Sequence, residues 1–139
     1  MLAIAVASIL TMVALNTYRN HVEEAKIKAS IADMTRIDAA IARYQFDENQ
    51  LPVSLAEIFS PVPKDAWGNP FRYLRLRPAS RGSRGQARKD HNLVPINSDY
   101  DLYSSGPDGR SVAPLTGRAS RDDIVRGNNG GYIGKAADY

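Results

Sequence analysis

The chain opens on an apolar run that passes into a one-sided apolar pattern without a break. Residues 1–15 contain no charged residue, proline or glycine, and their only polar members are Ser8 and Thr11. Apolar residues then recur at steps of three or four, which is the period of one helix face. They are Ile27, Ile31, Met34, Ile37, Ile41 and Tyr44. Because the first helix breakers are Asn49 and Pro52, the pattern predicts one helix over about residues 1–47.

The two parts of this helix differ in surface. Residues 18–47 present one apolar stripe that can dock on a globular head. Residues 1–17 have no polar side, so we expect them to lie in lipid or among copies of the same chain. We therefore predict a membrane or filament-core segment over residues 1–17 and a globular part over residues 18–139. The large apolar residues of the first segment are its candidate contacts: Leu2, Ile4, Val6, Ile9, Leu10, Met12, Val13 and Leu15.

Other interpretations of the apolar run fit less well. Fifteen helical residues span about 22 Å, less than the roughly 30 Å hydrocarbon core of a bilayer, so we expect a few more residues in front. A cleaved secretory signal needs a basic start and a small-residue cleavage site, and neither is visible. A helix buried in a soluble domain normally has one polar face. The hydroxyls of Ser8 and Thr11 can bond back to helix carbonyls, which suits an apolar environment.

The remainder predicts short elements joined by turns. Ser54 and Glu57 have the spacing of a capping box that opens a short helix. Residues 63–74 predict a turn followed by a strand, in which four residues anchor the fold: Trp67, Gly68, Pro70 and Tyr73. Residues 99–104 alternate and predict a strand with Tyr100 and Leu102 on one face.

The expected fold class is α+β, with the long N-terminal helix packed on a small antiparallel sheet. Residues 93–96 are at best a short edge strand, because Pro95 cannot donate to a ladder. Residues 110–139 are rich in glycine, serine, asparagine and arginine, with two apolar islands at 124–125 and 132–133. We expect this tail to be irregular and to need something besides a core to hold it.

The amino-acid composition excludes several kinds of functional site. The chain has no cysteine, which excludes disulfides, thiolate metal sites and cysteine nucleophiles. Its net charge is only +3, but residues 72–89 hold seven basic residues and no acid. This Arg72–Lys89 segment could bind DNA or another polyanion, or it could be a solvated loop. We favour the loop and do not expect nucleic acid as a partner.

Four carboxylates near the end form a candidate metal site. Asp101 and Asp108 are seven residues apart on a predicted strand and turn, and Asp122 and Asp123 are adjacent in a later loop. Calcium takes six to eight oxygen ligands from such irregular loops. The alternative is that each aspartate bonds to its own turn backbone. The sequence leaves both interpretations open.

No pattern indicates an enzyme. His21 and His91 lie far from any serine and acid arrangement that would suggest a triad, and we expect both on the surface. The sequence has no HExxH, GxSxG, P-loop or GxGxxG motif in a useful context. We therefore expect a non-enzymatic protein.

Three blocks of the chain resemble the major pseudopilin of type II secretion systems and related type IV pilin-like subunits. They are the helix Tyr18–Pro52, the Trp-Gly-Asn-Pro turn within Pro63–Leu74, and Asp99–Gly109 followed by Asp122–Ile124. The turn and the aspartate–serine–glycine–proline–aspartate block are specific in combination, whereas the helix alone is not. The family's mature chain also carries a glutamate near its start, and here the first acid is Glu23.

The resemblance implies a filament subunit. Family members assemble through their N-terminal helices, so it implies a helical homo-oligomer, with an assembly platform and minor pilins as further partners. It implies an inner-membrane location before assembly, with the globular part in the periplasm, and a filament in the periplasm or at the cell surface. A secretion pseudopilus and a surface pilus for adhesion or motility both remain possible. Several family members bind calcium, and by motif their ligands correspond to Asp101 and Asp108, with help from Asp122 and Asp123.

Overall fold

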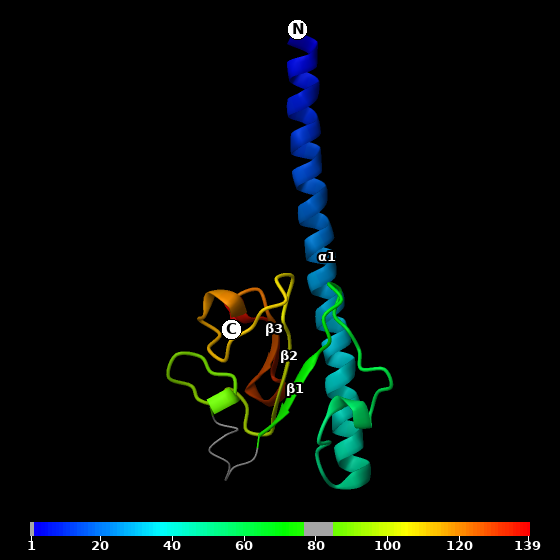
Figure 1. Ribbon diagram of the computed structural model, residues 1–139, viewed down its shortest axis with the longest axis vertical. Helices are drawn as coiled ribbons and strands as arrows, with labels where there is room; N and C mark the ends of the chain where they lie inside the picture. The colour runs from blue at the N-terminus through cyan, green and yellow to red at the C-terminus, as the bar shows by residue number, and fades with distance from the viewer. Residues whose placement is uncertain (1, 77–84) are drawn as a thin grey trace.

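The protein has one long helix and a small antiparallel sheet (Figure 1). The computed structural model describes residues 2–76 and 85–139. Helix α1 runs over Leu2–Glu48 and is followed by strands β1 (Arg72–Arg75), β2 (Tyr100–Ser104), β3 (Ile124–Gly127) and β4 (Tyr132–Lys135). The strands pair antiparallel in the order β1-β2-β3-β4. The predicted α+β fold with a long N-terminal helix is confirmed.

Residues 2–76 and 85–139 also contain four short 3-10 helices, three in connections between elements and one after β4. They are η1 (Leu55–Glu57), η2 (Arg118–Ser120), η3 (Asn128–Gly130) and η4 (Ala136–Asp138). The capping box predicted at Ser54 is wrong in its details, because the Ser54 side chain makes no capping bond. The Glu57 carboxylate instead accepts the backbone N–H of Val53 at 3.0 Å and the hydroxyl of Tyr44 at 3.2 Å. The carboxylate therefore ties η1 to α1 rather than closing a cap.

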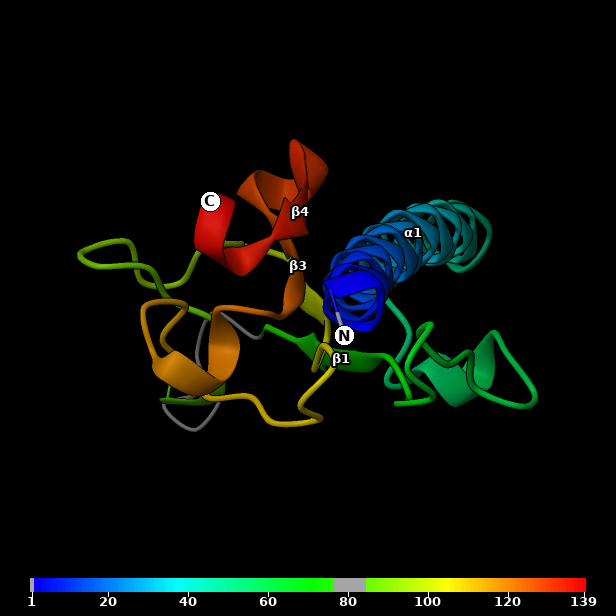
Figure 2. The same ribbon diagram turned by 90° about the horizontal axis from the view of Figure 1, so that it is seen from above.

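The second half of α1 docks on one face of the sheet. Met34, Ile37 and Ile41 are buried, as the period of three and four predicted. They share a core with apolar residues of the sheet and its flanks: Leu55, Phe71, Tyr100, Leu102 and Ile124. Figure 2, viewed from above, shows α1 on one side of the strands. This core fixes the direction in which the first half of α1 projects.

A second core covers the other face of the sheet. Val125 of β3 packs with Ile96, Leu115 and Ala136, and Tyr103 of β2 lies against this group. The faces alternate along β3, because Ile124 belongs to the first core and Val125 to the second. The irregular tail predicted for residues 110–139 is therefore wrong in part. Its two apolar islands are β3 and β4, which complete the sheet.

The Trp-Gly-Asn-Pro turn joins the head to α1. The Asp65 carboxylate accepts the backbone N–H groups of Trp67 at 3.0 Å and Asn69 at 2.8 Å, and Gly68 has φ +92°, where glycine is favoured. The indole N–H of Trp67 donates to Glu23 of α1 at 3.0 Å. The turn thus holds the helix near the point where it leaves the head.

The structure also shows the contacts of the other two expected anchors, Pro70 and Tyr73, and of the possible edge strand at residues 93–96. Pro70 forms an isolated bridge with Lys64, and the Tyr73 hydroxyl donates to the Pro52 carbonyl at 2.9 Å. Residues 93–96 belong to none of the four strands. Leu93 makes only an isolated bridge with Asp90.

Candidate functional site

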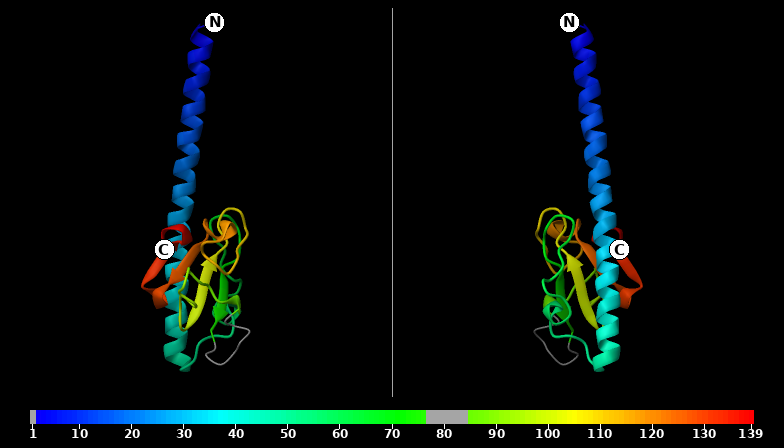
Figure 3. Two further views of the ribbon diagram at one scale, coloured as in Figure 1. Left: turned by 90° about the vertical axis from the view of Figure 1, so that its left-hand side faces the viewer. Right: turned by 90° about the vertical axis from the view of Figure 1, so that its right-hand side faces the viewer.

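The first third of α1 is an apolar rod that projects from the head (Figures 1 and 3). Its large side chains from Ile4 to Leu15 each leave between 50% and 69% of their surface exposed: Ile4, Val6, Ile9, Leu10, Met12, Val13 and Leu15. The side chain of Leu2, also expected in this set, lies outside the described residues. Soluble monomers rarely expose a continuous apolar patch of this extent. The exposed apolar rod is therefore the main candidate for an interaction surface.

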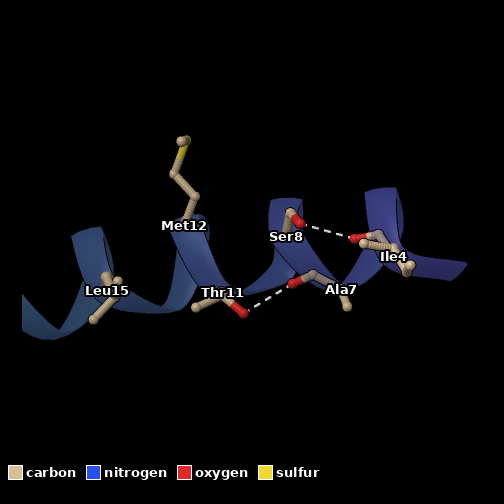
Figure 4. A pocket seen from close by; sticks show the side chains of 6 residues that line it. All are labelled: Ile4, Ala7, Ser8, Thr11, Met12 and Leu15. Atoms are coloured by element: carbon tan, nitrogen blue, oxygen red, sulfur yellow. Dashed lines mark hydrogen bonds between the residues drawn. The ribbon is translucent and has the colours of Figure 1, made fainter. Parts of the chain in front are cut away.

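Small and hydroxyl residues line a shallow groove along this rod (Figure 4). Ala7, Ser8 and Thr11 lie between the larger side chains of Ile4, Met12 and Leu15. The Ser8 hydroxyl donates to the Ile4 carbonyl and the Thr11 hydroxyl to the Ala7 carbonyl, both at 2.8 Å, as the sequence predicted. The groove thus presents few free polar groups, and small residues at a helix surface allow close approach of another helix.

One observation bears on the predicted membrane segment. Over residues 2–76 and 85–139, no helix is both long and apolar enough to cross a membrane.

Two of the four candidate calcium residues lie at the surface. Asp108 is exposed, and its carboxylate accepts the backbone N–H of Arg110 at 2.7 Å. Asp122 is half-buried, and its carboxylate lies 3.4 Å from the backbone nitrogen of Asp108. The Asp108 contact is that of a turn aspartate, which was the alternative interpretation, whereas the Asp122 contact is to a backbone group 14 residues away. They bring Asp108 and Asp122 together on one side of the loop.

The other two carboxylates are buried and face Arg88. One Asp101 oxygen accepts the backbone N–H of Arg88 at 2.7 Å, and the other accepts the side-chain amide of Asn97 at 2.9 Å. Asp123 pairs with the Arg88 guanidinium at 3.2 Å, and both side chains are almost fully buried. The second Asp123 oxygen is buried without a hydrogen-bond partner.

As they stand, the four carboxylates do not form one calcium ligand set. Both Asp101 oxygens already accept hydrogen bonds, and Asp123 already neutralises a guanidinium. In the described part of the chain, no group of three or more His, Cys, Asp or Glu residues is arranged to hold a metal. Calcium binding at these residues stays a prediction.

The Arg72–Lys89 segment has fewer side chains free to bind a polyanion than its sequence suggests. Arg88 is buried, and Arg75 donates to the Leu51 carbonyl at 3.0 Å. Arg77, Arg81 and Arg84 fall in residues 77–84, outside the described residues. The expectation that residues 78–92 form an exposed loop is therefore wrong at Arg88, because its guanidinium meets acceptors in the interior. The two histidines are exposed, as expected.

A second buried arginine links α1 to the sheet. Arg126 of β3 makes two hydrogen bonds to Asp99, each at 2.9 Å, and pairs with Asp38 of α1. Its guanidinium lies 3.9 Å from the ring centroid of Tyr100, whose hydroxyl donates to Asp38 at 2.6 Å. Burial and the Asp38 hydrogen bond raise the pKa of Tyr100. Sequence reasoning missed this cluster, and its only signal was an acid beside the apolar stripe.

We predict that Asp123 makes the protein less stable to unfolding as the pH rises from 4.5 to 7. Burial raises the pKa of Asp123 to about 6 from an ordinary value of 3.8, although Ser111 and Arg88 oppose the shift. Between these values the folded state binds more protons than the unfolded state, so the free energy of unfolding falls as pH rises. From pH 4.5 to 7, wild type should lose about 2 kcal/mol relative to Asp123→Asn, which lacks the titrating group.

The measurement is urea unfolding of both proteins at the two pH values. Asp108→Asn, which removes an exposed carboxylate from the same loop, is the control for loss of negative charge. A difference between wild type and Asp123→Asn that is the same at pH 4.5 and 7 would contradict the prediction. It would mean that Arg88 keeps Asp123 ionised throughout.

Comparisons with protein-family models, with curated proteins and with solved structures found no match.

Proposed function

We propose that this chain is the structural subunit of a helical filament of the pseudopilus or type IV pilin kind. The observation that carries the proposal is the exposed apolar rod at residues 4–15, continuous with a helix whose other half is docked on a folded head. One end of α1 is thus fixed, and the other is left with a surface unsuited to water. Copies of the rod packed together would cover it.

The energy available from such packing is large. Burying a large apolar side chain is worth about 1.5–3 kcal/mol relative to leaving it in water. Seven such side chains, each at least half exposed, would contribute on the order of 10 kcal/mol per subunit. The gain is smaller if the rod leaves lipid rather than water, and packing at small residues then matters more. The groove at Ala7, Ser8 and Thr11 suits that case.

Several finer expectations belong to the same proposal. They are an inner-membrane location before assembly, a periplasmic head, and contacts with an assembly platform and minor pilins, all implied by the resemblance. A secretion pseudopilus and a surface pilus would use the same rod. The proposed role is structural, and we propose no catalytic activity. A polyanion-binding module is disfavoured because Arg88 and Arg75 are engaged within the head.

Electron microscopy tests the proposal. The full chain is purified in detergent, the detergent is removed, and the sample is compared with filaments sheared from cells that produce the chain. We expect filaments of uniform diameter that contain this chain by mass spectrometry. A dispersed monomer in both preparations would contradict the proposal.

A further inference from the structure

The guanidinium of Arg88 lies in a pocket of oxygen atoms beneath residues 105–123, the C-terminal loop that connects β2 to β3. Its side chain is 3% exposed. It donates to Asp123 at 3.2 Å and to the Ser120 hydroxyl at 3.4 Å. It also donates to the Ser111 hydroxyl and the Val112 carbonyl. One carboxylate, two hydroxyls and a carbonyl, all between residues 111 and 123, thus converge on a single cation.

The same residue is bound to the sheet. The Arg88 guanidinium lies over the ring of Tyr103 in β2, 3.5 Å from its centroid, which is a cation–π contact. The Arg88 backbone N–H donates to Asp101, also in β2, at 2.7 Å. Tyr103 and Asp101 lie on the face of the sheet that is turned away from α1. Arg88 therefore joins the sheet to the loop through its side chain and backbone together.

Backbone hydrogen bonds also join Arg88 and the next residue to two other segments of the chain. Lys89 donates to the Ala113 carbonyl at 3.1 Å and accepts from Leu115 at 2.9 Å, while Ile96 donates to the Arg88 carbonyl at 3.0 Å. Leu115 and Ile96 are buried members of the second core. The position of Arg88 is thus fixed by the fold.

We infer that the Arg88 guanidinium is the cation that holds the C-terminal loop on the sheet, in the role that the resemblance would give to calcium. A buried carboxylate needs a counter-charge, and Arg88 supplies it to Asp123. A divalent ion brought to the same carboxylate would be repelled by the guanidinium about 3 Å away. The head of this protein therefore keeps its fold without a divalent metal.

The test compares metal and guanidinium as the source of stability. The full chain in detergent is melted while near-UV circular dichroism of Trp67 and the tyrosines is followed, in excess EGTA and in millimolar calcium. The same curves are recorded for Arg88→Met, which removes the charge, and for Arg88→Lys, which keeps it on a smaller head group. Arg36→Met is the control, because the Arg36 side chain is 81% exposed.

We expect the wild-type melting temperature to be the same in EGTA and in calcium. Arg88→Met should lower it by about 10 °C or more in both buffers, and Arg88→Lys should lie in between. If Arg88→Met does not fold, a folded Arg88→Lys with a reduced melting temperature supports the inference. A wild-type melting temperature that falls in EGTA and recovers with calcium would overturn it. Melting of Arg88→Met or Arg88→Lys at the wild-type temperature would overturn it as well.

Discussion

A single charge in the exposed apolar rod, introduced as Ile9→Glu, is expected to abolish filament formation and leave the head folded. Ile9 is 64% exposed and lies in the middle of the rod. In a filament core the carboxylate would be surrounded by apolar side chains of other subunits, where an unpaired charge costs several kcal/mol. Every subunit carries the substitution, so the penalty recurs at every contact.

The matched control is Ala39→Glu, which places the same charge at an exposed position in the docked half of α1. Both variants should give the wild-type near-UV circular dichroism spectrum, because neither position belongs to either core. Electron microscopy should show filaments for Ala39→Glu and none for Ile9→Glu. Normal filaments from Ile9→Glu would mean that the rod is not the assembly surface.

The largest expected loss of stability comes from Arg126→Ala. The Arg126 side chain is 4% exposed and is the shared partner of Asp38 and Asp99. Removing it would leave these two partly buried carboxylates side by side without a counter-charge and would remove the stacking on Tyr100. Breaking a buried ion pair in this way typically costs about 3–5 kcal/mol. Urea unfolding of the full chain in detergent should show a loss of this size.

Arg36→Ala provides the comparison for Arg126→Ala. Arg36 also pairs with an aspartate, Asp33, at 3.3 Å, but its side chain is 81% exposed. Surface pairs of this kind contribute about 1 kcal/mol at most. Equal losses for the two variants would show that the Arg126 cluster contributes no more than a surface pair. The apolar core would then account for the docking of α1 on the sheet without a large contribution from this cluster.

The long helix could be predicted from sequence because its signal is local and repeated. A helix buries a residue every three or four positions, and the stripe from Ile27 to Tyr44 repeats that step five times without a breaker. The projecting segment was equally clear, since residues 1–15 have no charge at all. These two patterns account for α1 and for the candidate assembly surface.

The C-terminal half could be predicted only in part, because its order depends on distant contacts. β3 and β4 are four residues each, which is too short for a periodic signal. They form because β3 pairs with β2 and because their side chains pack in the second core. An isolated two-stranded hairpin is only marginally stable in water. Reading residues 110–139 alone therefore predicted an irregular tail where the sheet is completed.

The two buried arginines could not be predicted for a similar reason. Arg88 stands in a run of arginines with little apolar character, which is the usual composition of a solvated loop. Arg126 follows Ile124 and Val125 but carries no sign of its partner Asp38, which is 88 residues away. A buried charge is recognised by what surrounds it, and that is set by the tertiary structure.

The four candidate calcium residues also show that sequence spacing does not decide which side chains meet in the fold. Their spacing suggested one calcium site, but the alternation of β2 and the position of Arg88 divide them into two groups. Asp101 and Asp123 lie inside against Arg88, and Asp108 and Asp122 lie towards the surface. The sequence could propose the residues, whereas only the fold decides which of them meet.

The most direct measurement of the central claim is photo-cross-linking from within the rod. The chain has no cysteine, so Ile9→Cys provides one unique site for a benzophenone label. The labelled protein is illuminated after assembly, and the same protein held dispersed in detergent is the control. We predict cross-links between copies of this chain, with mass spectrometry placing the contacted residues between positions 2 and 17, and none in the dispersed control. Labelled protein that reacts only with solvent, lipid or detergent in both states would contradict the account.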